Sequence, residues 1–107
     1  MRSILYHAIL VSAVNKEDIH IAYRKARAIF GDLTSEIVES RRSALYSFFI
    51  APDGFSEGSE WFQEEKARRQ EFQEWLEAED ALFVDWAEVA YGPKIVVSKI
   101  QEERDKQ

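Results

Sequence analysis

Two short segments of this chain are apolar at nearly every position. Ile4–Val11 reads Ile-Leu-Tyr-His-Ala-Ile-Leu-Val, and Ala44–Ile50 reads Ala-Leu-Tyr-Ser-Phe-Phe-Ile. A strand that is apolar on both faces is typical of the interior of a sheet, because a half-exposed strand alternates polar and apolar residues. The sequence therefore predicts two interior strands, around which the other elements have to be arranged.

The remaining patterns give the order of the elements. Lys16–Phe30 is an amphipathic helix with Asn15 as its N-cap and Gly31 at its end. The other expected elements are strands at Thr34–Ser40, Phe83–Tyr91 and Ile95–Ile100 and a second helix at Ser59–Glu79. This order predicts an α+β fold, a ferredoxin-like split β-α-β sandwich. An antiparallel sheet of four to five strands would carry both helices on one face, with the two apolar segments at its centre.

The second helix has a weaker pattern than the first. Its apolar residues lie near its two ends, and its centre, Gln63–Glu71, is polar apart from Ala67. Glu64–Arg68 and Glu65–Arg69 are i,i+4 pairs in the favourable order. We expect this helix to pack through Phe72–Leu76, with a solvated centre.

The length and composition indicate a single domain. The chain has 107 residues, of which 46% are hydrophobic and 13% aromatic, enough apolar material for one core. We expect one α+β domain over residues 1–100. Residues 101–107 are charged and carry no apolar anchor, so they are expected to form a frayed tail.

Composition excludes several classes of function. Cysteine is absent, which excludes disulfides, thiolate metal sites and cysteine nucleophiles and agrees with a cytoplasmic location. The net charge of −6 disfavours nucleic-acid binding, whose affinity comes mainly from neutralising phosphates.

No apolar run approaches the roughly 18–20 residues of a membrane span, so no membrane association is expected. The first residues weakly resemble a signal peptide, but Tyr6 and His7 interrupt the apolar run.

The titratable residues form no recognisable catalytic motif. His7 and His20 would need a carboxylate such as Asp85 or Glu88 to make an acid–base or metal site, and their spacing fits no metal motif. Asp85 and Glu88 are three residues apart on a predicted strand and so point to opposite faces, which does not suit a glycosidase-type pair. We expect no catalytic residue, no metal site and no cofactor. His7 is interpreted as a hydrogen-bonded sheet residue and His20 as a surface residue.

Candidate partner-binding residues lie in two loops. Phe55, Trp61 and Phe62 form an aromatic cluster at the entry to the second helix, and aromatic residues are enriched in binding hot spots. The alternative is that these rings cover the core. Arg41 and Arg42 lie at the tip of a predicted hairpin, where arginine can bind a carboxylate or phosphate with two hydrogen bonds. The alternative there is a solvated basic turn.

The predicted architecture leaves one face of the sheet without a cover. If both central strands are apolar on both sides, that face would be a large apolar patch, which is unusual on a soluble monomer. We favour a homodimer packed sheet to sheet. The alternative is a monomer in which Tyr6, Tyr46 and Ser47 make the face sufficiently polar.

These observations favour a small non-enzymatic protein-interaction module that binds another protein or itself. The alternative is a small-molecule-binding or enzymatic ferredoxin-like dimer. Its pocket would lie between sheet and helices, with Tyr6, His7 and Tyr46 as polar contacts. An acidic mimic of nucleic acid is disfavoured because lysine and arginine are intermixed with the carboxylates. Residues 41–54 and 85–92 resemble segments of small prokaryotic or phage-borne proteins, a likeness that implies no activity.

Overall fold

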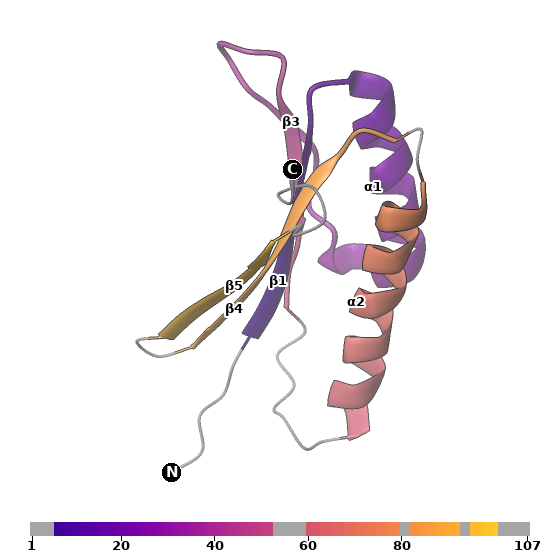
Figure 1. The fold of residues 1–107 in the computed structure, drawn as a ribbon, viewed down its shortest axis with the longest axis vertical. Coiled ribbons are helices and arrows are strands. Elements are labelled where there is room, and N and C mark those ends of the chain that lie inside the picture. Colours follow the sequence, from indigo (N-terminus) through magenta and orange to yellow (C-terminus); the bar gives the residue numbers. More distant parts are fainter. Residues whose placement is uncertain (1–5, 53–59, 80–81, 93–94, 101–107) are drawn as a thin grey trace.

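The protein is a two-layer α+β structure in a computed structural model that describes residues 6–52, 60–79, 82–92 and 95–100. The elements in chain order are β1 (Tyr6–Ala13), α1 (Lys16–Phe30), the short 3-10 helix η1 (Gly31–Leu33), β2 (Val38–Glu39), β3 (Tyr46–Ile50), α2 (Glu60–Ala78), β4 (Asp85–Gly92) and β5 (Ile95–Ile100). The strands form one sheet in the order β2-β3-β1-β4-β5, and every neighbouring pair is antiparallel. Both helices lie on one face, and no described helix covers the other (Figure 1).

The two apolar segments are interior strands, as their patterns predicted. β1 is the central strand of the five, with β3 on one side and β4 on the other. The α+β architecture, the antiparallel sheet and the two helices are therefore confirmed. No helix in the described part of the chain is long and apolar enough to cross a membrane. The predicted tail, residues 101–107, lies outside the described residues.

The second predicted strand is much shorter than expected. Only Val38–Glu39 pairs as a strand with β3, whereas Thr34 makes an isolated bridge to Ile50. Between them, the Ser35 N–H donates to the Phe49 carbonyl and the Ser35 hydroxyl accepts from the Phe49 N–H, both at 2.8 Å. A serine side chain therefore takes the place of a backbone partner here, which a β-propensity pattern does not reveal.

Helix α1 has the boundaries that its capping residues predicted. The Asn15 side chain accepts hydrogen bonds from the N–H groups of Glu17 at 2.8 Å and Asp18 at 3.2 Å. At the other end, Gly31 has a φ of 61°, a conformation that residues with a Cβ rarely adopt. The N-cap and the glycine together fix the length of α1.

The core lies between the sheet and the helices. Alternate residues of β1, Ile9, Val11 and Ala13, face the helices and are at most 3% exposed. The two helices contact each other through aromatic rings: Phe30 meets Phe72 edge to face at 5.8 Å. This packing fixes which side chains α2 presents to β1 and β4.

Candidate functional site

A cluster of polar side chains lies between α2 and the sheet. His7 of β1 and Glu88 of β4 both face the helices, and Nδ1 of His7 lies 2.8 Å from Oε2 of Glu88. From α2, Gln73 Nε2 donates to Glu88 Oε1 at 2.7 Å, and Arg69 Nε lies 3.6 Å from Glu88 Oε2. Three groups from two other elements therefore converge on one carboxylate.

The cluster continues along α2 toward its N-terminus. Arg69 Nη1 lies 3.4 Å from Glu65 Oε1, and Arg68 Nη1 lies 3.8 Å from Glu65 Oε2. Glu65, Arg69 and Gln73 are spaced at four residues and are only 3%, 5% and 6% exposed. The prediction of a more solvated centre is wrong for Glu65 and Arg69, which are buried against the sheet, whereas the other residues of Gln63–Glu71 are exposed.

Glu88 carries the clearest electrostatic signature of the cluster. Burial alone would raise the pKa of its carboxyl group. The hydrogen bonds from Gln73 and His7 and the positive charge of Arg69 outweigh burial and lower this pKa below its ordinary value. Glu88 is thus ionised at neutral pH and accepts only, so Nδ1 of His7 carries the proton between them.

The arrangement orients an imidazole with a carboxylate, as in many acid–base sites, but it is built as a closed network. The side chains of His7 and Glu88 are only 20% and 15% exposed, and the charge of Glu88 is compensated by Arg69. Within the described ranges, no group of three or more histidine, cysteine or acidic residues could hold a metal ion. The contacts of Gln73 and Arg69 with Glu88 connect α2 to the sheet.

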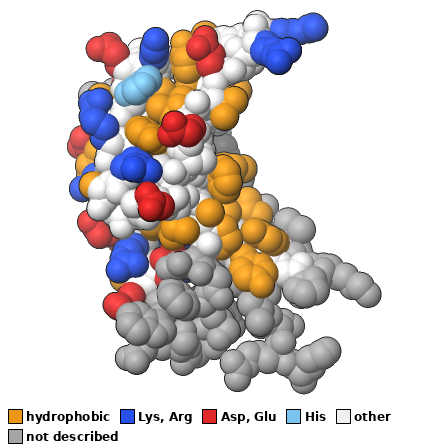
Figure 2. Space-filling view, turned by 180° about the vertical axis from the view of Figure 1, so that it is seen from behind, with side chains coloured by type: hydrophobic (Ala, Val, Ile, Leu, Met, Phe, Trp, Pro, Cys, Tyr) orange, Lys and Arg blue, Asp and Glu red, His pale blue; other side chains and the backbone are white. Residues whose placement is uncertain are grey.

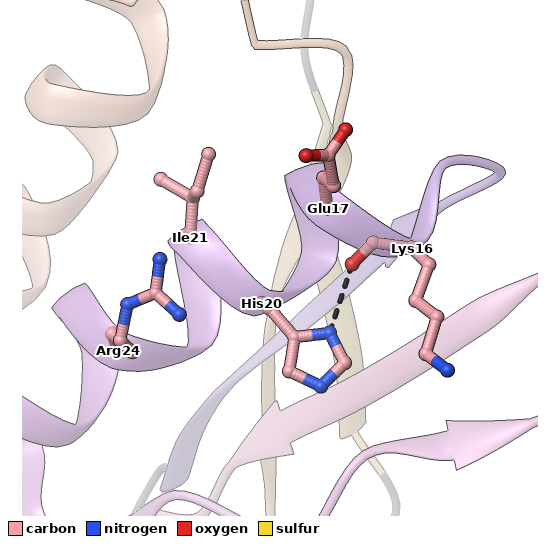
Figure 3. Close-up of a pocket in the computed structure, with 5 residues that line it drawn as sticks. All are labelled: Lys16, Glu17, His20, Ile21 and Arg24. Atoms are coloured by element: carbon pink, nitrogen blue, oxygen red, sulfur yellow. Dashed lines mark hydrogen bonds between the residues drawn. The ribbon is translucent and has the colours of Figure 1, made fainter.

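A depression of about 380 Å³ lies on the outer side of α1, lined by Lys16, Glu17, His20, Ile21 and Arg24. All five residues belong to one helix, and their side chains spread over its surface without converging on a common point (Figure 3). Nδ1 of His20 lies 2.8 Å from the Lys16 carbonyl oxygen, within the same helix. This hollow therefore offers no set of groups from different elements that would hold a ligand.

The uncovered side of the sheet, called here the open face, is the second candidate. Among the residues of β1 to β4, those on this face are Val38 of β2; Ser47 and Phe49 of β3; Tyr6, Ala8, Leu10 and Ser12 of β1; and Asp85, Ala87, Val89 and Tyr91 of β4. Four of them are large hydrophobic residues with substantial exposure: Val38 at 65%, Leu10 at 51%, Phe49 at 43% and Tyr91 at 36%. Figure 2 shows hydrophobic side chains gathered along the hollowed side of the molecule, away from the charged helical surface.

The open face has an apolar centre between two more polar ends. At one end, the hydroxyl groups of Ser12 and Ser47 lie 2.8 Å apart, and Ser12 pairs with Asp85. At the other end, the rings of Tyr6 and Tyr91 lie 5.6 Å apart. Asp85 is the only charged residue that β1 to β4 place on this face within the described part of the chain.

The structure places the predicted partner-binding residues only in part. Arg41 and Arg42 are exposed in the turn between β2 and β3, which projects beyond the sheet (Figure 1). Phe55 and the side chains of Trp61 and Phe62 lie outside the described part of the chain. Contact of any of these five residues with a partner stays a prediction.

The residues of the alternative ligand pocket are not brought together. Tyr6 lies on the open face, whereas its neighbour His7 faces the helices. Tyr46 packs against the core and pairs with Ala13, at the opposite end of β1 from His7. Asp85 and Glu88 point to opposite faces, as their spacing predicted, and His20 lies on α1, away from the Glu88 cluster.

The chain was compared with protein-family models, curated proteins and solved structures. None of these comparisons gives a match. Any function proposed for this chain therefore has to be inferred from its geometry.

The sequence interpretation did not identify the buried polar stripe of α2. The spacing in the sequence does indicate this stripe. Glu65, Arg69 and Gln73 are four residues apart, and Leu76 follows three residues later, so the three polar residues lie on the same side of the helix as the buried Leu76. The contact of this stripe with Glu88 could not be predicted from the helical spacing, since Glu88 lies beyond the end of the helix.

Proposed function

We propose that the protein is a small non-enzymatic interaction module that binds a protein partner through the open face of its sheet. The observation that carries this proposal is the exposure of Val38, Leu10 and Phe49 on one face of the sheet. Among the described side chains of that face, only Asp85 is charged. Contiguous apolar patches on soluble proteins mark interaction sites, because each Å² removed from water stabilises a complex by roughly 25 cal/mol.

The proposed fold type gives a reason for the open face. The order β2-β3-β1-β4 with antiparallel neighbours supports a ferredoxin-like split β-α-β sandwich to which β5 adds a strand. In such a sandwich both helical connections cross on the same side of the sheet. The opposite face therefore stays available to a partner.

The Glu88 cluster favours this function over the enzymatic alternative. A catalytic histidine needs a free edge toward substrate, whereas His7 is largely buried against a carboxylate that Arg69 and Gln73 also hold. We assign the cluster to holding α2 on the sheet. Arg41 and Arg42, in the turn that projects from the sheet, would extend the binding surface at its rim.

Capture experiments with matched variants test this proposal. Phe49→Asp places a charge in the centre of the open face, and Ile21→Asp places one on α1, where Ile21 is 37% exposed. The tagged full-length chain should capture its partner, whether another protein or itself, and Phe49→Asp should lose it. Ile21→Asp should bind as the wild type does, and circular dichroism should show both variants folded. Equal capture by both variants, or a wild-type chain that binds nothing and stays monomeric, would contradict the proposal.

A further inference from the structure

We infer that the occupant of the open face is a second copy of this chain, packed face to face about a two-fold axis that runs along β1. This inference rests on the proposed function, because it names the partner of the same surface. Three properties of the face support it: its area, its lack of charge and the distribution of large and small side chains across it.

The area of the face suits a dimer interface at the small end of the usual range. The five strands contain 8, 2, 5, 8 and 6 residues, and at about 3.3 Å per residue and about 4.8 Å between strands they cover about 460 Å² in projection. The relief of side chains adds to this figure. Specific interfaces bury about 600 Å² or more on each partner, so the dimer needs contact over nearly the whole face, including the relief of its side chains.

The charge of the face favours a copy over an oppositely charged partner. The chain carries a net charge of −6 and 32% charged residues, so two copies repel wherever their charged surfaces meet. The centre of the open face avoids this repulsion, because its one described charge, Asp85, lies in the end row beside Ser12. A partner selected by charge would find no complementary group at the centre, whereas a second apolar face needs none.

The side chains across the centre differ in size in a way that is self-complementary. Leu10 pairs with Phe49 of β3 on one side and with Ala87 of β4 on the other, in a row that the register continues to Ile100 of β5. This row carries a large ring at β3 and a methyl group at β4.

A two-fold axis along β1 lays β3 of one copy over β4 of the other. Phe49 of each copy then lies over Ala87 of the second copy, and Leu10 meets its equivalent at the axis. Sheets that pack in this aligned way are about 10 Å apart with strands within about 30° of each other. An axis across the strands would instead place ring against ring and methyl against methyl, which packs poorly.

Paired charge substitutions test both the occupant and the axis. Light scattering and native mass spectrometry should show that the wild-type chain is a dimer. Phe49→Asp and Ala87→Lys should each weaken dimerisation by at least about 100-fold, because each buries an unpaired charge. When the two variants are mixed, the new carboxylate faces the new ammonium group across the axis, so a heterodimer should form with at least about tenfold higher affinity than either homodimer.

Controls keep the outcome independent of folding. Ile21→Asp carries the same charge change outside the face and should remain dimeric, and circular dichroism should show every variant folded. Leu10→Thr gives the test without a charge: each dimer loses two leucine contacts at the axis, so its affinity should fall about tenfold or more.

The possible failures are distinguishable from failure of the proposed function. A wild-type chain that is monomeric at high micromolar concentration overturns the second copy. The proposed function still stands in that case if Phe49→Asp abolishes capture of a different protein. A wild-type dimer with variants that do not pair when mixed overturns the axis along β1. A dimer unaffected by Phe49→Asp, Ala87→Lys and Leu10→Thr overturns both the inference and the use of the open face for self-binding.

Discussion

Glu88 is the residue on which three polar side chains from β1 and α2 converge. Its carboxylate is held by His7 at 2.8 Å and Gln73 at 2.7 Å and lies beside Arg69. Glu88→Gln keeps the size of the side chain but removes the charge that compensates Arg69. We expect a loss of about 2 kcal/mol in the free energy of unfolding, measured by urea denaturation at neutral pH.

The matched control for this change is Glu71→Gln. Glu71 is exposed on α2, so the same neutralisation there should alter stability by less than about 0.5 kcal/mol. Equal effects of the two substitutions would show that Glu88 adds nothing beyond its formal charge.

The lowered pKa of Glu88 predicts a pH dependence with a definite sign. A carboxyl group with a lower pKa in the folded state binds protons more tightly in the unfolded state. Its contribution is therefore complete above the unfolded-state pKa, about 4.3 for glutamate, and is lost as the pH falls through the folded-state value. The stability difference between wild type and Glu88→Gln should shrink between pH 6 and the acid limit of folding. A constant difference over this range would contradict the assignment.

Single residues show how far the sequence could predict the site. The spacing of Asp85 and Glu88 predicted that they face opposite sides, and they do, because a strand alternates strictly. A carboxylate partner for His7 was identified as a possibility with two candidates. The choice between them depends on the pairing of β1 with β4, which joins residues about eighty positions apart and leaves no local trace.

Helix α2 buries a polar stripe, Glu65, Arg69 and Gln73, beside the apolar residues Phe72 and Leu76. Glu65 and Arg69 are almost fully buried and lie 3.4 Å apart. Removing Arg69 leaves both Glu65 and Glu88 without its positive charge, whereas removing Glu65 as well leaves only Glu88 without it. Arg69→Met should therefore destabilise the protein by about 3 kcal/mol, and adding Glu65→Met should recover part of this loss.

The stability that the second substitution restores is the informative quantity. It is measured by comparing the denaturant unfolding of the two single variants with that of the double variant. Arg68→Met is the control, because that side chain is about half exposed and should contribute little. A double variant as unstable as the sum of the two single variants would show that the two charges act independently.

The N-cap of α1 gives a second prediction for an element. The Asn15 side chain accepts from two N–H groups that the helix itself leaves without partners. Asn15→Ala should lower stability by about 1 kcal/mol, and Asn15→Ser should cost much less because serine caps equally well. Thermal unfolding compares the two variants, and equal losses would show that the cap hydrogen bonds contribute nothing.

The elements differ in how well the sequence specified them, for physical reasons. Asn15 and Gly31 bound α1 by local rules, so its predicted and observed limits coincide. The strand before β3 was overestimated because Ser35 replaces a backbone hydrogen bond with its side chain. Glu65 and Arg69 of α2 were misassigned because a hydrophobicity pattern places charged residues in solvent, whereas these two are buried as an ion pair.

At the scale of the whole molecule, association would couple stability to concentration. If two copies unfold and separate together, a tenfold rise in protein concentration stabilises each chain by about 0.7 kcal/mol. The midpoint of thermal unfolding should therefore rise with concentration in the wild type and stay constant in Phe49→Asp. A midpoint independent of concentration in the wild type would indicate a stable monomer.

The two residues of β2 also limit how large an assembly can become. A sheet that adds further chains side by side, as amyloid does, needs a free row of backbone N–H and C=O groups at each margin. On the β2 margin that row is two residues long, and the adjoining Ser35 already engages the backbone of β3. The short strand therefore acts as a stop that works against open-ended fibre growth from this margin.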